Sequence, residues 1–349
     1  MPAEMSLNAA MLAAGPAGAG LGMILDGPMA AQVAAVLARL GVPDRLADGP
    51  LTAAELAGEL GAGADPLGRV LAAAAVFGLV TRDAAGRFAL TGAGELLRSD
   101  APGSARYLAA GFLGPAMWAC YGQLTEIVRS GRLADPGAPG GVYEYFGRHP
   151  DEARLFARAM QRVTSILAAE LTASGYRPPA AGRIVDVGGG SGTLLAQLLL
   201  AAGEGSGVLF DRPEALAEAP GVLAGAGVAG RVELVPGDFM QEVPAGGDLY
   251  VLCQVLHNWH DELAQVIVGN CRRASRPGSS LLVIEYVLPD GPEPSLAHLM
   301  DLIMLTVVGG RERSRAEHAA LMAGAGYTLV SDTPLDSVLP WHALEFRRD

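Results

Sequence analysis

From residue 183 onward, apolar strand-like runs alternate with helical stretches, and this alternation constrains the fold more than any other feature. The runs are RIVDVGG, GVLFD, RVELVPGD, DLYVLCQV, SSLLVIEYV, YTLVSD and ALEFRR. Strands that alternate with helices predict an α/β domain with a mostly parallel, doubly wound sheet. Ligands of such sheets bind outside the carboxyl ends of the strands, so the residues at those ends are the first candidates for chemistry.

The first strand runs into a glycine-rich loop, VDVGGGSG. Glycines let the backbone turn tightly and let a ligand approach closely, and the N–H groups of the following helix suit a negative group. Gly188, Gly190 and Gly192 have the G-x-G-x-G spacing common at S-adenosylmethionine (SAM) sites, whereas the dinucleotide pattern requires glycine where Thr193 stands. We expect Asp186, Gly188 and Gly190 to contact SAM, and an NAD-dependent dehydrogenase is the alternative that the loop allows.

Acidic residues also close the next two strands. Asp211 ends the second strand, where a carboxylate can accept both hydroxyl groups of a ribose. Asp238 and Phe239 end the third, and a carboxylate beside a ring suits adenine, which offers an amine and a flat face. The alternative is that Asp238 caps the next helix and Phe239 lies in the core. Acids at three successive strand ends favour a cofactor that contains adenosine.

The fourth strand runs into CQVLHNWHDE, which carries two of the six histidines. His257 stands where the strand stops and is the candidate general base, whereas His260 lies near the next helix. No further His or Cys cluster supports a metal site, so we expect no metal. Glu285, which ends the fifth strand, or Glu312 in GGRERS could orient the imidazole through its other nitrogen. A surface ion pair with a neighbouring arginine is the alternative for Glu312.

The first hundred residues have the pattern of a winged helix. Thr52 and Glu55 form a capping-box pattern, a second apolar helix follows around residues 66–78, and LVTRDAAGRFALT reads as a hairpin wing. Winged helices often bind DNA, but residues 51–100 hold four arginines against six acids, and the whole chain has a net charge of −12. Phosphate contacts need several basic side chains, so we expect a packing module without a nucleic-acid partner. A ligand-responsive regulator is the alternative of another class.

Cysteine spacing and hydropathy indicate a cytoplasmic protein. Cys120, Cys253 and Cys271 are scattered and fit neither a disulfide framework nor a zinc site. Residues 5–25 and 107–125 are uncharged, but glycine and proline interrupt both stretches, and no basic residue precedes the first. We therefore expect neither a signal peptide nor a membrane-spanning helix.

Taken in order, VDVGGGSG, PGDFM, LHNWHDE and GGRERS resemble the motifs of SAM-dependent small-molecule O-methyltransferases, both the plant caffeate type and bacterial natural-product enzymes. The resemblance covers nearly the whole chain. It implies a Rossmann-like methyltransferase sheet with an N-terminal, mostly helical winged-helix dimerisation domain. The implied domains are a dimerisation domain at 1–105, a helical connector lining the substrate pocket at 106–176, and a SAM-binding domain at 177–349. It also implies an intertwined homodimer in which the N-terminal domain lends residues to the partner's pocket.

The same resemblance implies roles for individual residues. His257 would be the general base, flanked by Glu285 and Glu312. Met160 and Met304 resemble methionines that hold a flat aromatic substrate, although both could be core residues. The implied SAM contacts are Gly188, Asp211, Asp238 and Phe239, with Cys253 and Trp259 also assigned to the cofactor side, and Asn258 to the substrate side. Asn258 replaces the acid that usually follows the catalytic histidine, and Cys253 stands where plant members have lysine.

The expected function is methyl transfer from SAM to a phenolic hydroxyl of an aromatic, polyketide-like secondary metabolite. His257 would remove the proton while oxygen and methyl are held in line. With phenol near pKa ~10 and histidine near ~6.5, full proton transfer is uphill by ~4.8 kcal/mol, which a glutamate beside the ring would reduce. The alternative on this fold is a SAM-binding hydroxylase or decarboxylase. The sequence leaves open the substrate, the methylated position, an amine or carboxyl acceptor, and which glutamate orients His257.

Overall fold

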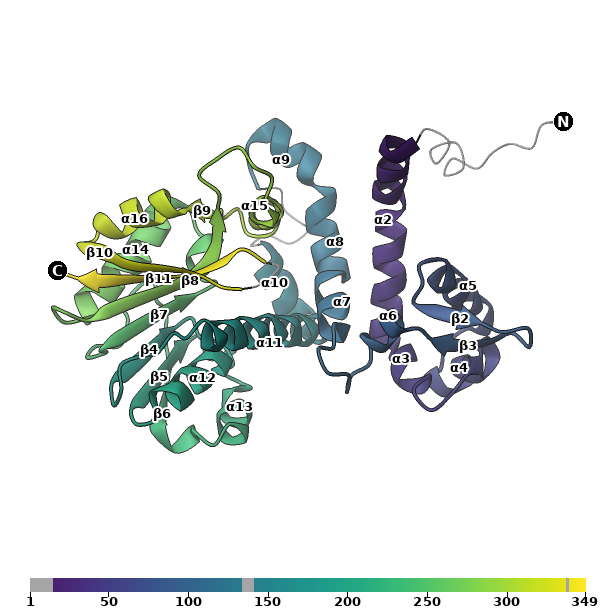
Figure 1. Ribbon diagram of the computed structural model, residues 1–349, viewed down its shortest axis with the longest axis horizontal. Coiled ribbons are helices and arrows are strands. Elements are labelled where there is room, and N and C mark those ends of the chain that lie inside the picture. Colours follow the sequence, from purple (N-terminus) through teal and green to yellow (C-terminus); the bar gives the residue numbers. More distant parts are fainter. Residues whose placement is uncertain (1–14, 134–140, 337–338) are drawn as a thin grey trace. The chain divides into compact units, whose positions relative to one another are not determined.

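The computed structural model describes residues 15–133, 141–336 and 339–349, and the chain forms two compact units. The first contains Met1–Trp118 and Phe146–Met160, and the second contains Ala119–Tyr145 and Gln161–Asp349 (Figure 1). The stretch 106–176, expected to be a separate connector, is thus divided between the two units.

The first unit contains the predicted winged helix. Thr52 accepts a hydrogen bond from the Glu55 amide, and the Glu55 carboxylate accepts one from the Thr52 amide at 2.7 Å, which forms the expected capping box. The three strands pair in the order β1-β3-β2 and pack with the helices around Leu37, Leu71 and Phe88. The elements are α2 (Gly15–Leu40), α3 (Val42–Arg45), β1 (Leu51–Thr52), α4 (Ala53–Leu60), α5 (Ala64–Val76), β2 (Val80–Arg82), β3 (Arg87–Leu90), α6 (Gly92–Glu95) and α7 (Arg106–Phe112).

Helix α2 has an unusually apolar surface. Its segment Gly20–Leu40 is long and apolar enough to cross a membrane by length and composition alone. Core helices and signal sequences meet the same criterion, so this property distinguishes none of them. Of the uncharged stretch 5–25, residues 5–14 lie outside the described part of the chain. Large apolar side chains are exposed between residues 21 and 29 of α2, namely Leu21, Met23, Ile24, Leu25 and Met29.

The second unit is built on one large sheet, and all seven predicted runs are strands. The order is β10-β11-β8-β7-β4-β5-β6, with β9 paired to the end of β8. The run β8-β7-β4-β5-β6 is parallel, and β11 and β10 add antiparallel strands at one side. The strands are β4 (Arg183–Val187), β5 (Ser206–Asp211), β6 (Val232–Pro236), β7 (Leu249–Cys253), β8 (Ser280–Leu288), β9 (Arg313–Ser314), β10 (Tyr327–Pro334) and β11 (Trp341–Arg348).

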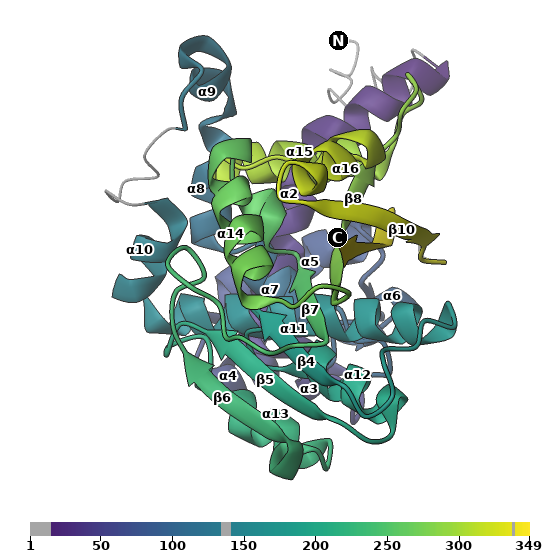
Figure 2. The ribbon, with the colours of Figure 1, turned by 90° about the vertical axis from the view of Figure 1, so that its left-hand side faces the viewer.

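Helices cover both faces of this sheet (Figure 2). Successive strand residues face opposite sides, so Ile184 packs with α11, α12 and α13, whereas Val185 packs with α14 and α16. The strand order changes direction between β4 and β7, and their carboxyl ends adjoin. The remaining elements are α8 (Pro115–Gly122), α9 (Leu124–Ser130), α10 (Gly141–Arg148), α11 (Pro150–Ala173), α12 (Thr193–Ala202), α13 (Ala219–Gly225), η1 (Ala229–Arg231), η2 (Leu256–Asn258), α14 (Asp261–Ala274), α15 (Leu296–Val307) and α16 (Arg315–Ala323).

Candidate active site

The glycine loop lies at the carboxyl end of β4 and needs its glycines. Gly188 and Gly190 have φ angles of +75° and +56°, which side chains rarely tolerate. A Cβ atom on Gly188 would lie 2.9 Å from Cγ2 of Val255, whereas the space beside Gly190 is open to 4 Å. The Gly190 amide donates to Asp211 Oδ2 at 2.9 Å. The loop and the acid at the end of β5 are therefore neighbours, as the sequence predicts.

Asp186 is a buried carboxyl group with an unusual environment. It is 1% exposed, and neither oxygen has a hydrogen-bond partner among the described residues. Burial and the charge of Asp211 raise its pKa to about 7, against a smaller opposing effect of the Leu195 backbone amide, which approaches the carboxyl group without reaching hydrogen-bond geometry. Buried polar groups in proteins are normally paired, so this orphaned carboxyl group is suited to a cationic or donor group of a ligand.

The ends of β4, β6 and β7 meet at one edge of the sheet. The Phe239 ring contacts Trp259 edge-on, with centroids 6.2 Å apart, and its Cε1 atom lies 3.5 Å from where a Gly188 Cβ would be. Asp238 accepts the Met240 amide at 2.9 Å, so it caps a turn, while its carboxylate keeps further acceptor capacity. Phe239 and Trp259, both expected on the cofactor side, are thus brought together beside Gly188.

Tyr143 is a neighbour of this edge that the sequence did not reveal. The guanidinium carbon of Arg212 lies 5.6 Å from the centroid of the Tyr143 ring. Arg212 also donates its amide to Asp211 Oδ1 at 2.7 Å. Tyr143 belongs to α10, far from the glycine loop in sequence, and carries no motif that could have signalled the contact.

His257 lies in η2, directly after β7, and is 5% exposed. Its Nδ1 atom is 2.8 Å from Glu312 Oε1, a hydrogen bond, and 3.4 Å from Glu285 Oε2. The other carboxylate oxygen of Glu285 accepts the backbone amides of Val255 at 3.0 Å and Leu256 at 2.8 Å. Glu312 therefore orients the ring, and Glu285 mainly holds the turn that carries it.

The charges around His257 favour the protonated ring. Burial lowers the pKa of His257, but the charges of Glu285 and Glu312 and the hydrogen bond to Glu312 outweigh it and raise the pKa to about 9. Burial raises the pKa of Glu285 above its usual value. Cys253, at the end of β7, is half-buried, and burial also raises the pKa of its thiol.

The alternative of a surface ion pair for Glu312 is wrong. Glu312 is only 1% exposed. The arginines beside it pair elsewhere: Arg311 with Glu317 and Asp261, Arg313 with Asp261, and Arg315 with Asp332.

His257, Glu285 and Glu312 also present one ligand atom each within 4.8 Å of one another, a spacing that could hold a metal ion. The hydrogen bond from Nδ1 to Glu312 occupies the nitrogen nearest the carboxylates. The absence of a metal therefore remains a prediction.

The three residues assigned to the substrate side lie in different parts of the structure. The side-chain Nδ2 of Asn258 donates to the Gln254 carbonyl at 3.2 Å, so this side chain stabilises the His257 turn. Met304 is half-buried in α15, within the second unit. Met160 ends a segment of the first unit, and its role toward a substrate remains a prediction.

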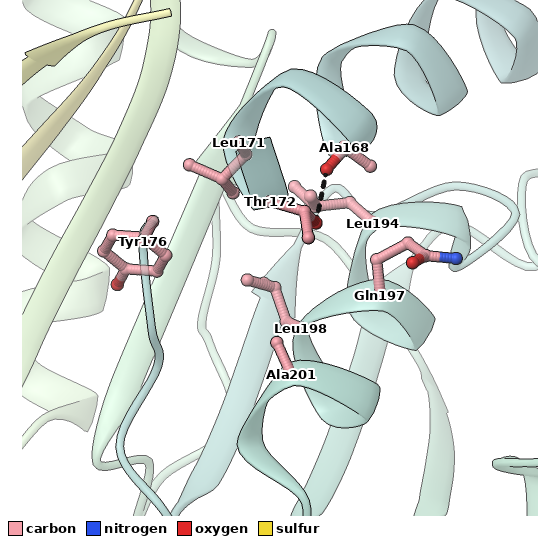
Figure 3. Close-up of a pocket in the computed structure, with 8 residues that line it drawn as sticks. All are labelled: Ala168, Leu171, Thr172, Tyr176, Leu194, Gln197, Leu198 and Ala201. Atoms are coloured by element: carbon pink, nitrogen blue, oxygen red, sulfur yellow. Dashed lines mark hydrogen bonds between the residues drawn. The ribbon is translucent and has the colours of Figure 1, made fainter. Parts of the chain in front are cut away.

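A small cavity lies away from these residues, between α11 and α12 (Figure 3). It has room for about one water molecule, at about 10 Å³, and Thr172 beside it donates its hydroxyl to the Ala168 carbonyl. This cavity is too small for a substrate. Its lining residues are Ala168, Leu171, Thr172, Tyr176, Leu194, Gln197, Leu198 and Ala201.

Comparison with known proteins gives two family matches. Residues 121–328 match an O-methyltransferase domain, and residues 23–100 match an O-methyltransferase dimerisation domain. Phenazine O-methyltransferase PhzM of Lysobacter antibioticus is 37% identical over 318 residues, which cover 90% of this chain and 92% of that protein.

Two further relatives bear on the ligands. The 8-amino-8-demethylriboflavin N,N-dimethyltransferase of Streptomyces davaonensis is 35% identical over 321 residues, covering 89% of this chain and 90% of that protein. The crystal structure of NcsB1, an O-methyltransferase from neocarzinostatin biosynthesis in complex with SAM and 2-hydroxy-5-methyl naphthoic acid, aligns with a TM-score of 0.76 at 34% identity. That alignment covers 91% of this chain and 96% of the NcsB1 chain.

Proposed function

The chain belongs to the SAM-dependent O-methyltransferase family, and from that premise we propose that it methylates a phenolic hydroxyl group with His257 as general base. The observation that carries this proposal is the buried Nδ1–Glu312 hydrogen bond of 2.8 Å. It leaves Nε2 as the ring nitrogen to receive a proton, at the edge of the sheet that also bears the glycine loop.

The residues of this edge fit the cofactor. The unpartnered carboxyl group of Asp186 suits the ammonium group of SAM, and the open space at Gly190 admits its amino-acid portion. Asp211 would accept the ribose hydroxyls, and Asp238 with Phe239 would hold the adenine. When bound, SAM supplies an electrophilic methyl group.

His257 is a stronger base here than in water. Against a phenol of pKa ~10, a histidine of ~6.5 accepts the proton at a cost of ~4.8 kcal/mol. A His257 pKa of about 9 reduces that cost to about 1.4 kcal/mol. Glu312 and Glu285 stabilise the imidazolium that forms, while Glu312 keeps the ring in one orientation.

The acceptor is proposed to be an aromatic natural product. The names of the relatives include a phenazine and a naphthoate, both flat aromatic systems. Met304 and Asn258 are the candidate substrate contacts in the second unit, since polarisable methionine suits an aromatic face. An aromatic amine is the second candidate acceptor, because one relative is named as an N,N-dimethyltransferase.

A homodimer formed through the N-terminal unit completes the proposal. The dimerisation-domain match at residues 23–100 supports it, as do the exposed apolar side chains of α2. We also propose a cytoplasmic enzyme without a membrane partner, on the basis of its scattered cysteines and the interrupted uncharged stretches, and without a nucleic-acid partner, on the basis of its net charge of −12. Light scattering at several concentrations would test the dimer, and a monomer throughout would contradict it.

Incubation with SAM and matched phenol and aniline analogues of aromatic metabolites tests the activity. Mass spectrometry should find a single added methyl group on the phenols, and methylation of the anilines alone would favour the amine acceptor. Products of hydroxylation or decarboxylation would replace the proposal by the other chemistry.

His257→Ala should reduce turnover by about 10²–10⁴-fold while SAM affinity measured by calorimetry is retained. His260→Ala is the matched control, because His260 lies on the same turn but is exposed. Unchanged turnover in His257→Ala would refute the assigned base.

A further inference from the structure

Arg313 is a fully buried cation beside the catalytic cluster. Its side chain is 1% exposed, and it is one of the largest side chains that are fully buried in the described part of the chain. The guanidinium donates to the carbonyl of Leu256 at 3.1 Å and to the carbonyl of Trp259 at 2.8 Å. It also donates twice to Asp261 Oδ1, at 3.0 and 2.8 Å. These acceptors lie on both sides of His257 in sequence.

The turn that carries His257 is strained, and both Glu285 and Arg313 bind its backbone. Gln254, at its start, has a φ angle of +56°, which is uncommon for a residue with a side chain. Glu285 binds the amide groups at the beginning of the turn. Arg313 binds the Leu256 carbonyl in the middle of the turn and the Trp259 carbonyl at its end. The two ionic side chains therefore fix opposite polar edges of one backbone segment.

The chain position of Arg313 links the turn to the residue that orients the ring. Arg313 directly follows Glu312, and its own backbone is registered on β8 opposite Val287. The Arg311 amide, on the other side of Glu312, donates to the His257 carbonyl at 2.8 Å. The segment 311–313 thus binds the imidazole ring of His257, the backbone carbonyl of His257 and the carbonyls of residues on either side of it.

We propose that Arg313 is a positioning residue that fixes the His257 turn relative to Glu312. This inference rests on the proposed role of His257 as general base. A planar guanidinium with several donors can hold two carbonyls and a carboxylate at once, which a lysine ammonium in the same place cannot do with the same geometry. A shift of about 1 Å in a catalytic group can cost about 10²-fold in rate.

The titratable groups on which the charge of Arg313 acts directly are Asp261 and His318. Asp261 is the partner that reaches solvent, with a side chain 58% exposed, and the Arg313 hydrogen bond lowers its pKa. Burial, followed by the charge of Arg313, lowers the pKa of His318 to about 3, so His318 is neutral. Arg313 is therefore a buried cation whose carboxylate partner, Asp261, lies at the surface.

Arg313→Lys tests the proposal, with Arg315→Lys as the control, because Arg315 lies two residues on, is half-exposed and pairs with Asp332. Arg313→Lys should lower kcat by about 10²-fold and leave the Kd for SAM within about twofold. In ¹⁵N-histidine spectra of the resting enzyme, the Nδ1 signal of His257 should move in Arg313→Lys and not in Arg315→Lys. Wild-type kcat with an unmoved signal overturns the proposal, and so does a kcat loss matched by an equal loss of SAM binding.

Asp261→Asn keeps the proposal testable if Arg313→Lys does not fold. It removes the negative charge that the guanidinium binds at an exposed position and weakens the two hydrogen bonds to Oδ1, so it should lower kcat and move the Nδ1 signal of His257 by smaller amounts than Arg313→Lys. No change in either quantity overturns the proposal. Because the spectra need no substrate, they judge the role of Arg313 even if the acceptor proves not to be a phenol.

Discussion

The proton affinity of His257 is set by two glutamates, and Glu312→Gln isolates the contribution of one. The glutamine keeps nearly the same volume and can still hydrogen-bond Nδ1, but it has no charge. Burial lowers the pKa of His257, but the charges of the two carboxylates and the hydrogen bond to Glu312 outweigh it, so that the pKa rises from 6.5 to about 9. Removing one of two charges at 2.8 and 3.4 Å should lower that pKa by about one unit, equivalent to about 1.4 kcal/mol.

The pH dependence of kcat/KM reports this change, because kcat/KM follows the protonation of the free enzyme. The base must be unprotonated, so kcat/KM of the wild type rises with pH and levels off above the His257 pKa. In Glu312→Gln the rise should begin about one pH unit lower. The plateau should also fall, by up to about tenfold for each unit of basicity lost.

The assay is the initial rate of methyl transfer from pH 6 to 10, followed by mass spectrometry. Glu262→Gln is the control, because Glu262 lies five residues after His257 in sequence but is exposed. A rise in Glu312→Gln at the same pH as in the wild type, or at a higher pH, would refute the assigned effect of Glu312.

Three further predictions follow from the same edge of the sheet. Folding raises the pKa of Asp186 from 3.8 to about 7, so stability is lost as pH rises through this interval. Asp186→Asn should therefore increase the free energy of unfolding of the ligand-free protein by up to about 4 kcal/mol above pH 7 and by nothing near pH 4, while it weakens SAM binding. The gain in stability should appear as a higher Tm at pH 8, and an unchanged Tm at that pH would contradict this. Gly310→Ala should destabilise the fold by about 1–3 kcal/mol in urea titration, because its Cβ would overlap the His257 carbonyl oxygen, and wild-type stability would count against that contact. Dialysis against EDTA should leave turnover unchanged, whereas a loss restored by one divalent metal would show that the His257 cluster holds an ion.

The sequence predicts the fold well because local patterns carry it. The alternation of apolar runs predicts β4 to β8, β10 and β11, and the pair Thr52 and Glu55 predicts the start of α4. The glycine loop could also be predicted, since the positive φ angles at Gly188 and Gly190 need residues without a Cβ atom.

The division of labour within the site could not be predicted in this way. The sequence identifies both glutamates as candidates, because Glu285 ends a predicted strand and Glu312 lies in the GGRERS loop. Only the structure shows that Glu312 contacts the His257 ring while Glu285 accepts backbone amides. Arg313 offered no signal, because its partners lie more than fifty residues away in sequence and two of them are backbone carbonyls. Such contacts depend on the register between β8 and β9, which hydrophobic patterning does not specify.

The unpaired carboxyl group of Asp186, beside the glycine loop, should make SAM binding depend on pH. With a pKa of about 7, Asp186 carries a proton in a large share of molecules at neutrality. An incoming ammonium group would expel that proton into the buffer, so the heat of uptake measured by calorimetry would vary with the ionisation enthalpy of the buffer. The proposed SAM site would consequently lose affinity as the pH falls below about 7.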